Sequence, residues 1–139
     1  MNHEIEAAHA HFTRKLELEA DAADVYEDLM NGADIVVIDA RKPDFYAKGH
    51  IPGAINVPHR TMNAETTASL AREKLYITYC DGPGCNASTR AAIHLSSLGF
   101  RVKEMPGGID WWVRVDGYPL AIGDEPGTLR PANAIECAC

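Results

Sequence analysis

The segment YITYCDGPGCNASTRAA, residues 76–92, contains two cysteines in a pattern suited to nucleophilic chemistry. Cys80 follows a run of β-prone apolar residues, and a helical pattern begins near Ser88. A thiol between a strand end and a helix N-terminus lies near unpaired backbone N–H groups, which lower its pKa and favour the thiolate. The segment therefore predicts Cys80 as a nucleophile. The alternative is an inert thiol, since buried cysteine often packs as a small hydrophobe.

The loop after Cys80 has the composition of an anion cradle but contains no cation. Two glycines let a tight turn aim several N–H groups at one point, although Pro83 supplies none. Asp81 places a carboxylate next to the thiol, which raises a cysteine pKa unless the carboxylate is turned away. We expect the backbone cradle to comprise Asp81, Gly82, Pro83, Gly84, Cys85 and Asn86.

The sequence around the other three cysteines indicates a chemical role less strongly than it does for Cys80. Cys85 does not lie at the strand end, so we interpret it as a small packing residue, with a resolving thiol for oxidised Cys80 as the alternative. Cys137 and Cys139 end the chain as Cys-Ala-Cys. Two ligands do not make a zinc site, so exposed thiols on a tail are expected, with no metal and no cofactor.

The elements that must position this loop follow an alternating pattern. IVVI at 35–38 is a run of β-branched residues typical of a strand covered on both faces, and KLELE at 15–19 has the period of a half-buried strand. We expect strands at 15–19, 34–40, 54–58, 75–80 and 100–105, and helices at 21–32, 42–49, 64–74, 87–99 and 108–117. Such alternation predicts an α/β protein with a mainly parallel sheet, whose ligands bind beyond the carboxyl ends of the strands. The loop 80–86 follows such an end.

Size and charge restrict the partners. The chain has 139 residues, which suits one domain, and a net charge of -7, which disfavours nucleic acid and anionic membranes as partners. No apolar run approaches the roughly 20 residues that span a bilayer. The first 12 residues lack the basic start and apolar run of a signal peptide, so a cytoplasmic protein with reduced cysteines is expected.

Three segments resemble the rhodanese (thiosulfate sulfurtransferase) family: VIDARKPDFYAKGHIPGAINVP at 37–58, the cysteine loop at 76–92, and LGFRVKEMPGGIDWWVRVDGYPL at 98–120. The loop resembles a variant with Cys-x-Gly-Pro-x-Cys. The resemblance covers 14–121, which leaves a leader at 1–13 and a tail at 122–139. It implies a three-layer fold: a five-stranded, mainly parallel sheet with helices on both faces.

The resemblance also implies a reaction. Cys80 would take a sulfane sulfur from a donor such as thiosulfate, hold it as a persulfide, and pass it to cyanide, a small thiol or a protein acceptor. Asp39, Arg41 and His50 would be scaffold near the site rather than catalytic groups. Without a cation in the loop a dianionic donor loses Coulomb energy, which the basic pair His59–Arg60 could partly replace.

Two other functions remain open at this point. A non-catalytic or redox-sensing module could use Cys80 and Cys85 in the same loop. Phosphatases and arsenate reductases of the same fold need Cys-x5-Arg, because the arginine clamps the oxyanion bidentately. Asn86 stands at that position here, which disfavours them.

Overall fold

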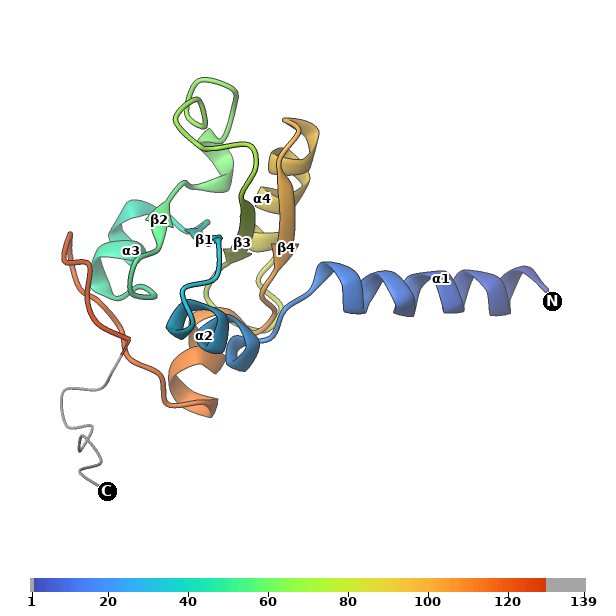
Figure 1. The fold of residues 1–139 in the computed structure, drawn as a ribbon, viewed down its shortest axis with the longest axis horizontal. Coiled ribbons are helices and arrows are strands. Elements are labelled where there is room, and N and C mark those ends of the chain that lie inside the picture. Colours follow the sequence, from blue (N-terminus) through green and yellow to red (C-terminus); the bar gives the residue numbers. More distant parts are fainter. Residues whose placement is uncertain (1, 130–139) are drawn as a thin grey trace.

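The structure is a computed structural model that describes residues 2–129 (Figure 1). Within these residues one sheet has the strand order β2-β1-β3-β4, formed by β1 (Ile35–Asp39), β2 (Ile55–Asn56), β3 (Leu75–Tyr79) and β4 (Arg101–Glu104). Every neighbouring pair is parallel. The carboxyl ends of all four strands therefore meet at one edge of the sheet, where Cys80 directly follows β3.

The helices of the described chain are α1 (His3–Leu18), α2 (Ala22–Met30), α3 (Pro43–Lys48), α4 (Ala87–Ser97) and the short α5 (Gly108–Asp110). A 3-10 turn, η1 (His59–Thr61), follows β2, and a π-helix, η2 (Trp111–Val115), continues from α5. The helix expected at 108–117 therefore forms, but its second half is wound more widely than an α-helix.

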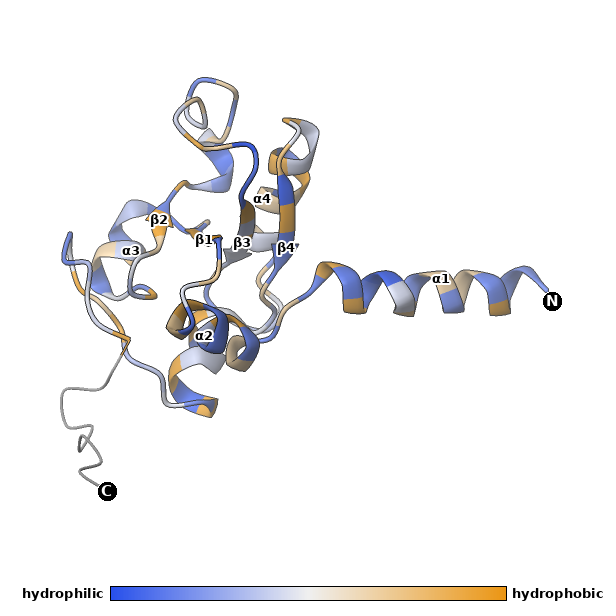
Figure 2. Cartoon of the chain, viewed as in Figure 1, coloured by the Kyte–Doolittle hydropathy of each residue, from blue (hydrophilic) through white to orange (hydrophobic). Residues whose placement is uncertain are grey.

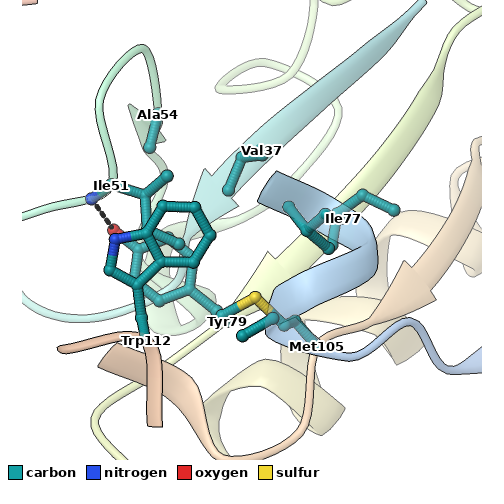
Figure 3. Close-up of a cluster of buried hydrophobic side chains, with 9 residues drawn as sticks. Val37, Ile51, Ala54, Ile77, Tyr79, Met105 and Trp112 are labelled. Carbon is teal, nitrogen blue, oxygen red and sulfur yellow. Dashed lines mark hydrogen bonds between the residues drawn. The ribbon is translucent and has the colours of Figure 1, made fainter. Parts of the chain in front are cut away.

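The sheet has a hydrophobic core on each face, because successive strand residues point to opposite sides. One core joins β1 and β3 to α2 and η2 through Val37, Ile77, Tyr79, Val25 and Trp112 (Figure 3). The other joins the same strands to α4 through Ile38, Tyr76, Ala91 and Leu95. Helices thus pack on both faces, which gives the three layers that the resemblance implied.

The prediction of a fifth strand at 15–19 is wrong, because α1 includes residues 15–18 and ends with Glu19 as its C-cap. The alternation in KLELE is too short to outweigh the helix-forming residues before it and the cap at its start, where Ile5 N–H donates to Asn2 Oδ1 at 3.0 Å. Lys15 and Glu19 add an ion pair one turn apart, at 2.9 Å. Only an isolated parallel bridge between Glu19 and Glu104 remains of the expected strand.

Helix α1 extends away from the sheet on the β4 side and buries none of its residues (Figure 1). Hydrophobic and hydrophilic residues alternate along it (Figure 2), and its larger apolar side chains Ile5, Phe12 and Leu16 are exposed. The sequence predicted a leader at 1–13 and a domain that starts at residue 14. Helix α1 continues across this boundary, so the end of the leader and the start of the domain belong to the same helix.

The predicted helix at 64–74 is also wrong, since these residues form successive turns. Asn63 Oδ1 accepts the N–H groups of Glu65 and Thr66, both at 2.9 Å, and Thr67 Oγ1 donates to Asn63 O at 2.8 Å. Short polar side chains that bond nearby backbone in this way compete with helix formation.

The described part of the tail packs against the domain. Gly123 N–H donates to Ala47 O at 2.8 Å, and Tyr26 OH donates to Leu129 O at 3.0 Å. Cys137 and Cys139 lie outside the described residues. None of the helices within 2–129 combines the length and the apolar character that crossing a membrane requires.

Candidate active site

Cys80 lies at the carboxyl edge of the sheet and is only 2% exposed. Its thiol donates to Cys85 O at 3.3 Å, and its Sγ lies 3.4 Å from Ser88 Oγ. A cavity of about 260 Å³ adjoins this sulfur and is lined by both cysteines, Ser88, Glu104 and Trp111, among others. The structure thus places a buried thiol next to a space large enough for a small substrate.

The loop after Cys80 turns back on itself through Gly84, whose φ of +84° favours glycine. Cys85 N–H donates to Gly82 O at 3.1 Å, which uses one of the N–H groups that the sequence assigns to an anion cradle. Asn86 takes the N-cap position of α4 without capping it through its side chain, and its Oδ1 accepts from Arg90 Nε at 3.1 Å. The rest of the cradle stays a prediction.

Asp81 is held by a cation that comes from another part of the chain. Its carboxylate lies 3.2 Å from Arg41 Nη1, which limits its repulsion of the Cys80 thiolate. Arg41 also binds the buried Asp39 carboxylate, with an Nη2–Oδ2 distance of 2.7 Å and an Nε–Oδ1 distance of 3.0 Å. Burial alone lowers the pKa of Arg41, but the bonds to Asp39 and its charge outweigh this and raise it.

Tyr79 joins this buried ion pair to the next loop. Its hydroxyl donates to Asp39 Oδ2 at 2.7 Å and accepts the N–H of Ile51 at 3.1 Å (Figure 3). Burial in particular raises the pKa of Tyr79 well above its ordinary value, so the phenol remains a hydrogen-bond donor.

His50 is buried but bonds elsewhere. Its Nδ1 lies 3.0 Å from Tyr46 O, its ring stacks on Tyr46, and its backbone pairs with Ala121. Of the three predicted scaffold residues, Asp39 and Arg41 reach the cysteine loop through Asp81, and the hydrogen bonds of His50 do not.

Two side chains near Cys80, Ser88 and Glu104, were not predicted to contact the site. Ser88 Oγ, next to the Cys80 sulfur, donates to Glu104 Oε2 at 2.7 Å, and Thr89 Oγ1 donates to the same oxygen at 2.6 Å. A hydrogen-bonded path therefore leads from the thiol through Ser88 to a carboxylate. Ser88 follows Cys80 closely in sequence, but Glu104 becomes a neighbour only because β4 pairs with β3.

The two thiols differ in acidity, and the pKa of Cys80 is raised although the sequence predicted that the helix N-terminus would lower it. Burial, followed by the hydrogen bond with Cys85, raises the pKa of Cys80 despite the favourable contacts with Ser88. Burial also raises the pKa of Cys85, but hydrogen bonds from the Cys80 thiol and from the backbone of Ala87 and Asp81 outweigh it, so that the net pKa is lowered. Deeper burial of Cys80 and the hydrogen bond between the two cysteines thus favour the thiolate of Cys85 over that of Cys80.

We expect this difference to appear in alkylation. As the pH rises, the rate of carbamidomethylation should reach its midpoint at a lower pH for Cys85 than for Cys80, because the thiolate is the reactive form. Peptide mapping by mass spectrometry follows each cysteine separately, and comparing midpoints rather than rates removes the effect of unequal exposure. A lower midpoint for Cys80 would contradict the assignment.

The described residues offer no metal site: in the part of the chain from 2 to 129, no three His, Cys, Asp or Glu side chains gather to hold an ion. The groups that the structure places at this edge of the sheet are two adjacent thiols, a hydroxyl–carboxylate pair and backbone N–H groups.

Known proteins are similar in sequence to this chain. The chain is 32% identical over 94 residues to the HTH-type transcriptional regulator Rv0324 of Mycobacterium tuberculosis, a match that covers 68% of this chain and 41% of that protein. It is 27% identical over 103 residues to a protein of Allochromatium vinosum named sulfurtransferase, covering 73% of this chain and 92% of the other. The chain thus spans less than half of the regulator.

Solved structures share the fold. The BH2092 protein of Bacillus halodurans superposes with a TM-score of 0.78 at 42% identity, over 84% of this chain and 85% of the other. A rhodanese-related protein of Thermoplasma volcanium superposes with a TM-score of 0.65 at 32% identity, over 76% and 98% of the two chains. The family model for the rhodanese-like domain matches residues 22–115, which include both central strands and the cysteine loop. The chain belongs to the rhodanese-like domain family.

Proposed function

We propose that this protein is a sulfurtransferase in which Cys80 carries a sulfane sulfur as a persulfide. The observation that carries the proposal is the position of Cys80 Sγ, beside a cavity of about 260 Å³ at the carboxyl edge of a parallel sheet. The resemblance of the chain to a protein named sulfurtransferase supports the same chemistry.

The transfer divides into two displacements. In the first, the Cys80 thiolate attacks the outer sulfur of a donor such as thiosulfate, whose S–S bond breaks as sulfite leaves. In the second, cyanide or an acceptor thiol attacks the outer sulfur of the persulfide and releases the Cys80 thiolate. Ser88 Oγ lies between Cys80 Sγ and the Glu104 carboxylate, so it can relay the thiol proton that must leave before the first attack.

Intact-mass measurement tests the proposal. After incubation with a sulfane sulfur donor, the wild type should gain the mass of one sulfur atom at Cys80, and cyanide should remove it as thiocyanate. Thiosulfate, an organic persulfide and a thiosulfonate should each be tried, because the donor is unknown. Peptide mapping separates this sulfur from any on Cys137 or Cys139.

The matched control is Cys80→Ser, which retains a hydrogen-bonding group of similar size. It should lose the cyanide-labile sulfur at position 80, and peptide mapping assigns any sulfur that remains to another cysteine. No sulfur on Cys80 of the wild type with any of the three donors would overturn the proposal.

A redox-sensing module is the second candidate, because the Cys80 thiol already bonds to the residue that bears the other thiol. Mild peroxide should then convert Cys80 and Cys85 into a disulfide, which peptide mapping under non-reducing conditions detects. Oxidation of Cys80 beyond the sulfenic acid without any disulfide would count against this function.

A further inference from the structure

Cys85 lies between two cavities. It lines the cavity of about 260 Å³ together with Cys80, and it also lines a second cavity of about 170 Å³ that Cys80 does not reach. Among the described residues, Cys85 alone lines both. A thiol at this position can meet a molecule in either space.

The two cavities differ in charge. Among the described residues, the second is lined by Arg41, Lys42, His59 and Arg60 and by the carboxylate of Asp81. Arg41 is shared by Asp81 and the buried Asp39, so Lys42 and Arg60 leave an excess of one positive charge there. In contrast, the lining that residues 2–129 give to the cavity next to Cys80 has no cationic side chain and includes the Glu104 carboxylate. A small anion is attracted to the second cavity and repelled by Glu104 in the first.

The positive charges around this cavity affect the pKa of His59. Its pKa is lowered first by burial and then by the charges of Arg60, Arg90 and His94. Of these groups, Arg60 on η1 lines the cavity, and Arg90 and His94 lie on α4 outside its lining. The cation missing from the cysteine loop is supplied here by neighbouring elements.

We propose that the basic cavity binds a small dianionic sulfur compound, of which thiosulfate is the simplest, and that Cys85 takes its outer sulfur before Cys80 does. This inference rests on the proposed persulfide of Cys80. For an anionic donor it replaces direct attack by Cys80 with attack by Cys85, followed by transfer of the sulfur to Cys80.

The sequence of bonds balances without an added oxidant or reductant. The Cys85 thiolate attacks the outer sulfur of thiosulfate, the S–S bond of the donor breaks with its electron pair, and sulfite leaves. Cys80 then attacks the outer sulfur of the Cys85 persulfide. One S–S bond forms and one breaks, and the proton of the Cys80 thiol ends on Cys85. The sulfur finishes on the buried thiol, away from water.

This order matches what each thiol can do. Cys85 is the more exposed of the two, lies beside cations and has the lowered pKa, so it is the better nucleophile toward an anionic donor. Cys80 is buried next to Ser88 and suits storage of the sulfur. The hydrogen bond from the Cys80 thiol to Cys85 O already holds the two residues together.

A single-turnover experiment with thiosulfate tests the order. In Cys80→Ser the sulfur should remain on Cys85, which peptide mapping detects. In Cys85→Ser the loading of Cys80 from thiosulfate should be slower by about tenfold or more, because the positioned intramolecular delivery is lost. Loading of Cys80 in Cys85→Ser at the wild-type rate would overturn the inference, as would a Cys80→Ser variant that takes no sulfur at Cys85.

Arg60→Gln tests the cavity itself. The variant should need about fivefold to tenfold more thiosulfate for half-maximal loading, since one unit charge near the dianion is removed. Arg101→Gln is the matched control, because Arg101 begins β4 at the opposite, amino edge of the sheet and lies outside both cavities. Equal changes in the two variants, or none in Arg60→Gln, would contradict the proposal.

A binding measurement with an unreactive dianion tests the anion site independently of sulfur transfer. Sulfate, which cannot donate sulfur, should raise the NMR-observed pKa of His59 in the wild type, because a bound dianion stabilises the imidazolium. The rise should shrink in Arg60→Gln and persist in Arg101→Gln. An unchanged His59 pKa at saturating sulfate would overturn the anion site. Absence of sulfur on Cys80 with every donor would instead overturn the proposed function.

Discussion

Replacing Arg41 by methionine should lower the free energy of unfolding by about 3–5 kcal/mol, the usual loss when one partner of a buried ion pair is removed. Arg41 binds both oxygens of Asp39, donates to Gly49 O at 2.6 Å and reaches Asp81. Asp39 is fully buried, so without the guanidinium its charge keeps only uncharged donors such as the Tyr79 hydroxyl. Chemical denaturation monitored by tryptophan fluorescence measures the loss.

The double variant Asp39→Asn/Arg41→Met separates the buried charge from the lost packing. With the carboxylate neutralised, the loss caused by Arg41→Met should fall well below that in the wild-type background. Arg41→Lys should be intermediate, because an ammonium group cannot bind the two carboxylate oxygens in the same fork geometry. A loss below about 1 kcal/mol in the single variant would show that water or another cation replaces Arg41.

The central strands could be predicted from the sequence because their patterns have a direct physical cause. Both faces of β1 and β3 are covered by hydrophobic cores, and a strand buried on both faces is rich in apolar, β-branched residues. The apolar runs at 35–38 and 75–79 therefore indicate these strands directly. The errors occurred at the periphery. Alternation over the five residues at 15–19 is too short to exclude a helix of helix-forming residues. The cap at Asn2, which favours the helix, lies 13 residues before the start of that segment.

The candidate site was predictable only in part. The position of Cys80 after a strand is a local property, so the sequence places it correctly in the loop. The pKa of Cys80, however, cannot be judged from its neighbours in sequence alone. Burial to 2% exposure raises this pKa, against the influence of the helix N-terminus, and contacts with Ser88 lower it. The partner of Asp81 likewise comes from the end of β1, 40 positions away, where no pattern in the loop could indicate it.

Gly108→Ala should destabilise the protein by about 3 kcal/mol or more and disturb the cysteine loop. Gly108 has a φ of +54°, and a Cβ there would lie 2.8 Å from Cys80 C and 2.9 Å from Asp81 C, besides overlapping Cys80 O. The left-handed backbone alone costs about 1–2 kcal/mol, and overpacking adds the rest. The neighbouring Ile109 N–H donates to Cys80 O at 2.8 Å, so relief of the overlap must move either α5 or the backbone that bears the thiol.

Gly117→Ala is the matched control, because Gly117 has a similar φ of +68° and a Cβ added there would meet no atom within 4 Å. It should lose only the backbone contribution of about 1–2 kcal/mol and keep the wild-type rate of persulfide formation. Gly108→Ala should load sulfur more slowly even at temperatures where circular dichroism shows it folded, because Asp110 N–H also donates to Asp81 O, at 2.9 Å. Equal stability of the two variants would mean that the overlap relaxes at no cost. Equal loading rates would mean that α5 does not determine the position of Cys80.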